Sequence, residues 1–67
     1  MIAVTINGEP RRFPAPLSCQ QLIENLELAG KRVALERNGE IVPRSLFSEQ
    51  QLADGDRLEI VVAVGGG

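Results

Sequence analysis

Two Asn-Gly dipeptides limit the possible folds of this chain more than any other feature. Asn7-Gly8 follows residues 2–6, in which apolar side chains occupy every second position. Asn38-Gly39 follows a second strand-like segment, residues 33–37. Asn-Gly is the strongest short hairpin signal, because both central residues of a type I′ turn need positive φ. The sequence therefore predicts two β-hairpins, whose return strands are residues 9–13 and 40–42.

The remaining strand signals complete one sheet. Pro10 has no N–H to donate, so the strand 9–13 should lie at a sheet edge. Asp54-Gly55-Asp56 predicts a third tight turn. After it, a final strand places Leu58, Ile60, Val62 and Val64 on one face and Glu59, Val61 and Ala63 on the other. Residues 44–51 show no clear period, and we expect Leu46, Phe47 and Leu52 to close the end of the sheet from a loop or short helical turn.

One helix is predicted from about Ser18 to Ala29. Ser18 and Gln21 have the spacing of a capping box, and Leu17 and Leu22 have that of a hydrophobic staple. Gly30 is placed to end the helix, with positive charge just beyond it. The apolar stripe expected to face the sheet consists of Leu22, Ile23, Leu26 and Ala29. Together the elements predict an α+β fold, a mixed sheet of four or five strands with one main helix packed on one face.

Composition excludes most enzyme classes. The 67 residues contain no His, no Tyr and one Cys, so the usual acid–base and nucleophile constellations cannot be assembled, and no metal site is expected. Cys19 is expected to be a small buried hydrophobic residue. A net charge of -2 without a basic run argues against nucleic acid, and no apolar stretch is long enough to span a membrane. We expect a non-enzymatic cytoplasmic protein.

Three glycines follow the final strand. Residues 1–64 are expected to form the folded domain, and residues 65–67 a mobile tail with nothing to bury. Glycine lacks Cβ, so Gly65-Gly66-Gly67 could pass through a narrow channel in a partner. This pattern indicates that the carboxylate of Gly67 is itself the working group.

The chain resembles the ThiS family of sulfur-carrier proteins of thiamine biosynthesis, which have a ubiquitin-like β-grasp fold. The resemblance covers the whole chain and rests on residues 4–9, the stretch Asn38-Gly39-Glu40-Ile41-Val42-Pro43-Arg44, residues 52–56 and the final Gly66-Gly67. It implies that the first and last strands lie parallel and adjacent at the centre of the sheet.

The resemblance also implies a function. The Gly67 carboxylate would be adenylated by an enzyme related to ubiquitin-activating enzymes, which supplies ATP and Mg²⁺, so this chain itself binds no cofactor. Sulfur from a cysteine desulfurase or rhodanese-type donor would convert the adenylate to a thiocarboxylate, which thiazole synthase accepts. Gly65 and Gly66 would extend the tail so that the Gly67 carboxylate reaches the active site of the partner. Arg44, Val61 and Ala63 are candidate partner contacts, although the segment 44–51 could instead cover Val61 and Ala63.

Two other functions stay open on the sequence. One is a carrier like the small subunit of molybdopterin synthase, which also ends in Gly-Gly. The other is a non-catalytic ubiquitin-like binding module or protein modifier, since a shared fold does not fix function. As a modifier, this chain could form polymers only through Lys31, its single lysine, or through its N-terminus.

Overall fold

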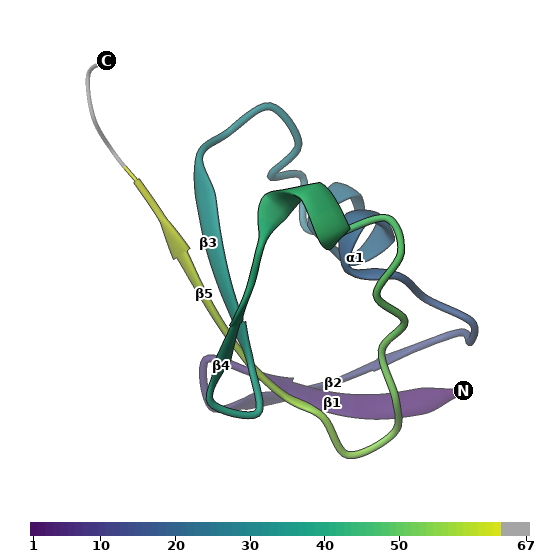
Figure 1. Ribbon diagram of the computed structural model, residues 1–67. Helices are drawn as coiled ribbons and strands as arrows, with labels where there is room; N and C mark the ends of the chain where they lie inside the picture. The colour runs from purple at the N-terminus through teal and green to yellow at the C-terminus, as the bar shows by residue number, and fades with distance from the viewer. Residues whose placement is uncertain (64–67) are drawn as a thin grey trace.

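The computed structural model describes residues 1–63, which form one five-stranded sheet with a short helix on one face (Figure 1). In chain order the elements are β1 (Ile2–Ile6), β2 (Glu9–Phe13), α1 (Cys19–Asn25), β3 (Val33–Arg37), β4 (Glu40–Val42), a 3-10 turn (Arg44–Leu46) and β5 (Arg57–Val62). The strand order is β2-β1-β5-β3-β4. Only β1 and β5 run parallel, and every other neighbouring pair is antiparallel. The predicted mixed sheet, with the first and last strands adjacent at its centre, is confirmed.

Both Asn-Gly turns have the predicted geometry. Asn7 and Gly8 have φ values of 51° and 85°, and Asn38 and Gly39 have 52° and 87°. Two consecutive positive φ values are the mark of a type I′ turn, which matches the twist of the flanking strands. Strand β2, with Pro10, lies at the edge of the sheet as expected.

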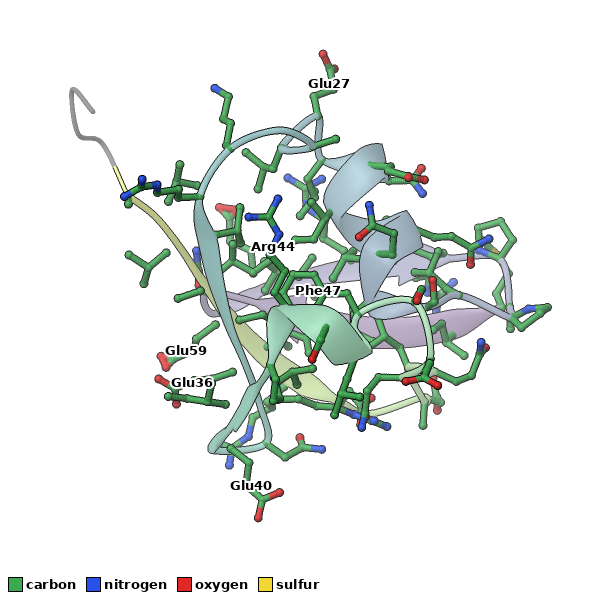
Figure 2. All side chains as sticks on the ribbon, turned by 45° about the horizontal axis from the view of Figure 1, so that its top comes forward. Glu27, Glu36, Glu40, Arg44, Phe47 and Glu59 are labelled. Carbon is green, nitrogen blue, oxygen red and sulfur yellow. The ribbon has the colours of Figure 1, made fainter. Side chains whose placement is uncertain are left out.

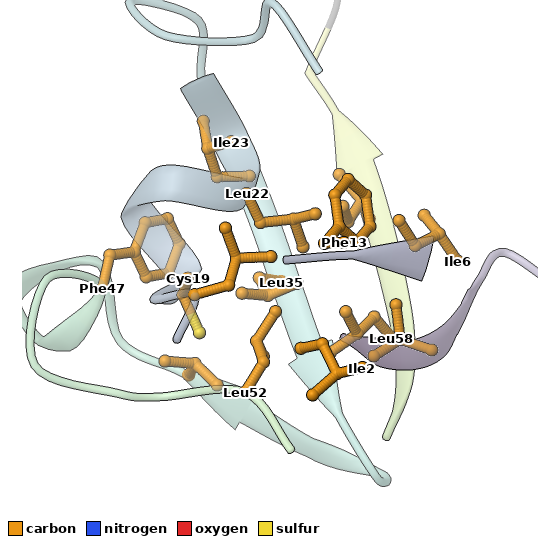
Figure 3. Packing of buried hydrophobic residues seen from close by; sticks show 14 residues of the cluster. Ile2, Ile6, Phe13, Cys19, Leu22, Ile23, Leu35, Phe47, Leu52 and Leu58 are labelled. Atoms are coloured by element: carbon orange, nitrogen blue, oxygen red, sulfur yellow. The ribbon is translucent and has the colours of Figure 1, made fainter. Parts of the chain in front are cut away.

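The core lies between the sheet and α1 (Figure 3). Alternate residues of the central strands enter it, and Leu35 and Leu58 each expose only 1% of their surface. Phe47 and Leu52, from the connection between β4 and β5, close one end of this core as predicted. That connection is fastened to the start of the helix, because the Gln20 N–H donates to the Phe47 carbonyl at 2.9 Å and the Cys19 N–H to the Gln50 carbonyl at 3.0 Å.

The helix begins where the sequence predicts. The Ser18 hydroxyl accepts from the Gln21 N–H at 3.1 Å, and the Gln21 side chain accepts from the Ser18 N–H at 2.9 Å, which completes the capping box. Leu22 and Ile23 are buried against the sheet.

The predicted end of the helix at Ala29 is wrong. The last helical residue is Asn25, and Glu27 takes a left-handed conformation with φ 59°. The N–H groups of Glu27 and Leu28 donate to the carbonyls of Glu24 and Ile23, the two bonds of a Schellman motif. The early turn brings Leu28 against the core and leaves Ala29 exposed. Burying the larger side chain in place of the smaller one accounts for the difference.

Gly30 does have the positive φ that its position suggested, but for another reason. Its φ of 86° closes a separate turn, in which the Lys31 N–H donates to the Leu28 carbonyl at 3.1 Å. Because the helix has already ended at Asn25, its last turn contains no basic residue. The expected favourable charge at its C-terminus is therefore absent.

Candidate functional site

Strand β5 carries the chain from the centre of the sheet toward the C-terminus. On one side it pairs with β3 along its length, from Arg37↔Leu58 to Val33↔Val62. The Ala63 N–H donates to the Arg32 carbonyl at 2.9 Å, which continues this support to the last described residue. In Figure 1, β5 runs out past β1 and β2 on its way to the C-terminus. The candidate tail thus begins from a strand that is held on the β3 side.

Asn7 extends the support on the other side of β5. Strand β1 ends at Ile6, and the Asn7 N–H donates to the Leu58 carbonyl at 2.9 Å. The Asn7 side chain then binds both backbone groups of Ile60, with Oδ1 accepting from its N–H at 2.8 Å and Nδ2 donating to its carbonyl at 3.1 Å. Asn7 therefore acts as one further residue of β1. The sequence indicated Asn7 only as a turn residue.

Beyond Ile60, β5 has a neighbour on one side only within residues 1–63. In an antiparallel pair, every second residue directs its backbone groups toward the partner strand. The Ala63–Arg32 bond fixes this alternation, so the backbone of Val61 faces β3 and that of Val62 faces away. Val62 thus points its N–H and carbonyl toward the side on which β1 has already ended.

The two predicted contact residues on β5 lie at the surface. Val61 is 65% exposed and Ala63 is exposed as well. The segment 44–51 does not cover them, because it packs on the side of the sheet that carries α1. Val61 belongs to what we call the open face, the surface opposite α1 formed by the outward residues Ala34, Glu36, Ile41, Arg57, Glu59 and Val61. Its use in docking stays a prediction.

Arg44 is exposed but is not part of the open face. It starts the 3-10 turn and borders a small recess with residues of α1 and of the loop after it, including Gln20 and Lys31. The structure therefore does not bring Arg44 together with Val61, and a partner that contacts both must reach around the edge of the domain. The remaining predicted site residues, Gly65, Gly66 and Gly67, lie outside the described residues.

Cys19 is placed as a core residue. It has 0% exposure, and burial raises the pKa of its thiol despite the opposing charge of Arg37. A thiol that stays protonated and lies out of contact with solvent is a poor nucleophile. The chemistry available to this chain therefore does not involve Cys19.

Asp56 organises the turn that leads into β5. Its carboxylate accepts from Arg37 Nε at 2.8 Å, from Asn38 Nδ2 at 3.1 Å and from the Ala53 N–H at 2.8 Å. Burial by itself would raise the pKa of Asp56, but these hydrogen bonds and the charge of Arg37 outweigh it and lower the pKa. This cluster joins the second Asn-Gly turn to the start of β5. The sequence predicted the turn at Asp56 but not its partners.

Glu36 and Glu59 form a second feature that sequence reasoning missed. They lie directly opposite each other on β3 and β5, within the open face. Both stand at outward positions of an alternating pattern, and that pattern alone gives no pairing register.

Across residues 1–63, no group of three or more His, Cys, Asp or Glu side chains could hold a metal ion. In the same span, no helix has the length and apolar character needed to cross a bilayer.

Comparison with known proteins identifies the family. The sequence profile of the ThiS family matches residues 4–67. Sulfur carrier protein ThiS of Bacillus subtilis is 44% identical over 48 residues, which are 72% of this chain and 73% of that protein. A thiazole synthase of Paramagnetospirillum magneticum is 45% identical over 64 residues, or 96% of this chain. The chain spans only 20% of that longer relative.

The fold agrees with the sequence match. The crystal structure of thiamine biosynthesis protein ThiS from Geobacter metallireducens superposes with a TM-score of 0.82 and is 32% identical. The superposition covers 98% of this chain and all of the other. Since the profile, the relatives and the solved structure agree along nearly the whole sequence, this chain belongs to the ThiS family of sulfur-carrier proteins.

Proposed function

We propose that this protein carries sulfur as a thiocarboxylate on Gly67 and delivers it to thiazole synthase. The observation that carries the proposal is the family match, which extends through residue 67 and so includes the terminal Gly66-Gly67 pair. A central strand supported to Ala63 leads into this terminus. The folded domain then provides the surface that partner proteins bind, and the Gly67 carboxylate is the group that reacts.

The chemistry needs an activation step. A carboxylate is a poor acyl donor, because oxide is a poor leaving group. Attack of the Gly67 carboxylate on the α-phosphate of ATP releases pyrophosphate and leaves an acyl-adenylate. The terminal sulfur of a persulfide on the sulfur donor then attacks the acyl carbon, and AMP departs with its bonding electron pair. A thiol reductant cleaves the S–S bond of the resulting acyl disulfide and leaves the thiocarboxylate. ATP and Mg²⁺ act in the adenylating enzyme, so this chain is a co-substrate in the reaction.

Thiazole synthase is the acceptor that the relatives favour. Stretches similar to this chain occur within longer proteins named thiazole synthase in two organisms, at 45% and 34% identity. In these relatives a stretch similar to this chain is joined to a longer sequence named thiazole synthase. Such a fusion is expected of two proteins that act on each other. The molybdopterin-type carrier and the inert binding module have no such support.

The direct test is reconstitution. The protein is incubated with the adenylating enzyme and sulfur donor of its source organism, ATP, Mg²⁺ and a thiol reductant, and its intact mass is measured. We expect the mass to rise by the difference between sulfur and oxygen, and fragmentation to place the change at residue 67. Adding thiazole synthase with its other substrates should return the carboxylate.

Variants sharpen this test. Deleting Gly67, or appending one residue after it, should abolish conversion while leaving the melting temperature almost unchanged, since the change lies outside the core. Cys19→Ser is the matched control and should convert normally. Sulfur found on Cys19, or thiazole formed with the Gly67 deletion, would show that the proposal is wrong.

A further inference from the structure

The open face contains a pair of charges that works against the stability of its own sheet. Glu36 on β3 lies directly across from Glu59 on β5. Figure 2 shows the two side chains next to each other, on the side of the sheet away from α1. Like charges in directly opposed cross-strand positions are destabilising. The arrangement therefore lowers the stability of the isolated domain.

Neither carboxylate is neutralised by a neighbour in the described part of the chain. The ion pair between Arg37 and Asp56 is the only one found among residues 1–63. Arg57 lies on the same face, two residues along β5 from Glu59, but is not in ion-pair contact with either glutamate. The two glutamates thus form an acidic pair, and Arg57 is the cation that borders the same hollow.

The surroundings suit a long basic side chain. Glu36, Glu59, Thr5 and Arg57 border a shallow hollow of about 350 Å³. Apolar residues flank the glutamates, namely Ala34 and Val61 in the next cross-strand pair and Ile41 across from Glu36 on β4. Val61 and Ile41 are 65% and 73% exposed, which is high for large apolar side chains. An arginine or lysine can lay its apolar stem on such residues while its charged end meets carboxylates.

The function proposed above supplies the partner, and the inference rests on it. We propose that the adenylating enzyme docks on the open face by placing an arginine or lysine between Glu36 and Glu59. The cation relieves the repulsion between the two carboxylates, so a pair that weakens the free domain strengthens the complex. Val61 lies on β5, the last strand before residue 67. An enzyme that binds this face therefore also binds the strand from which the Gly67 carboxylate must reach its ATP.

Opposite effects on stability and binding distinguish this role from a structural one. Glu36→Gln and Glu59→Gln each abolish the charge repulsion of the pair with little change in shape. We expect each to raise the melting temperature by about 1–5 °C. Each should also weaken binding of the enzyme about three- to tenfold, with a smaller dependence of the affinity on salt.

Two further variants serve as controls. Arg57→Gln makes the open face more negative, so it should strengthen binding of a cationic partner. Glu40→Gln makes the same net charge change as the test variants, but Glu40 is on β4 and points away from the pair in Figure 2. It should leave affinity within about twofold of wild type, because exposed charges outside a contact contribute little.

The experiment measures affinity and conversion separately. Binding of each variant to the adenylating enzyme of the source organism is measured by calorimetry at low and high salt, and thiocarboxylate formation by intact mass. Weakened glutamine variants with raised melting temperatures support the inference. Glutamine variants that bind as tightly as wild type overturn it, whether or not wild type is converted. An enzyme that binds wild type but never converts it counts against the carrier function alone, and one that does not bind wild type counts against both.

Discussion

Arg37 and Asp56 form an ion pair of 2.8 Å in which only 8% of the aspartate side chain is exposed. The pair joins the end of β3 to the turn before β5, two segments that are 19 residues apart in sequence. Asn38 and the Ala53 N–H bind the same carboxylate. The ionised form of Asp56 is therefore held by the native structure and not by the unfolded chain.

This arrangement predicts a loss of stability in acid. The pKa of Asp56 is lowered in the folded state, so its contribution is fully present above the unfolded value of about 3.9. It is lost as the pH falls through that value toward the lower folded pKa. Asp56→Asn keeps the shape but removes the charge, and it should reduce the slope of stability against pH between about pH 5 and 2. Urea unfolding across this range measures the slope, and an unchanged slope contradicts the prediction.

The register of β5 predicts an alternation in amide exchange. The N–H of Ile60 donates to the Asn7 side chain, and that of Val61 faces β3. The N–H of Val62 points to the side where β1 has ended. Hydrogen exchange followed by NMR should therefore show Val62 exchanging faster than Val61. Equal protection at both residues would mean that another segment pairs with this edge.

Asn7 can be tested through its side chain alone. Asn7→Gly keeps the positive φ of the turn but removes both bonds to Ile60. We expect a loss of about 1–2 kcal/mol, since two buried backbone groups lose their partners. Asn7→Asp retains the acceptor for the Ile60 N–H but turns a second acceptor oxygen toward the Ile60 carbonyl, so it should recover only part of this loss. Denaturant unfolding ranks the variants, and the reverse ranking would contradict the anchoring role.

Glu27 allows a stabilising substitution. Its φ of 59° is unfavourable for any residue with a Cβ and suits glycine. Glu27→Gly should therefore raise stability by about 0.5–1 kcal/mol, since the relief of strain outweighs the added freedom of the unfolded chain. The same replacement inside the helix, Glu24→Gly, is the control and should lower stability by about 1 kcal/mol. The denaturant midpoints of both variants test this prediction. A loss of stability in both would contradict the left-handed conformation of Glu27 in the Schellman motif.

Leucines on the helix should differ in the cost of truncation. Leu22 has 0% exposure, so Leu22→Ala should cost about 2–5 kcal/mol. Leu26 forms the C-cap and is only partly buried, so Leu26→Ala should cost less, about 1–2 kcal/mol. Melting curves of the two variants test the order. A larger loss for Leu26 would mean that the helix extends further in solution.

The sequence predicts those features of the fold that depend on local chemistry. Both Asn-Gly turns and the Ser18 cap need particular residues at particular positions, and these are visible in the chain. The end of the helix at Asn25 is not visible, because it depends on whether Leu28 or Ala29 reaches the core. The opposition of Glu36 and Glu59 also depends on a pairing between distant strands. Local pattern shows that both residues face outward, but the register that makes them neighbours is a property of the assembled sheet.

The parallel pairing of β1 and β5 also has a consequence for folding. Their contacts join residues as far apart as 53 positions, as in the bonds between Asn7 and Ile60. Such non-local contacts slow folding, because most of the chain must be ordered before they form. A chain emerging from the ribosome without β5 has no partner to join its first hairpin to its second. The domain therefore becomes stable only after β5 has been made, so the folded sheet and its central strand appear together.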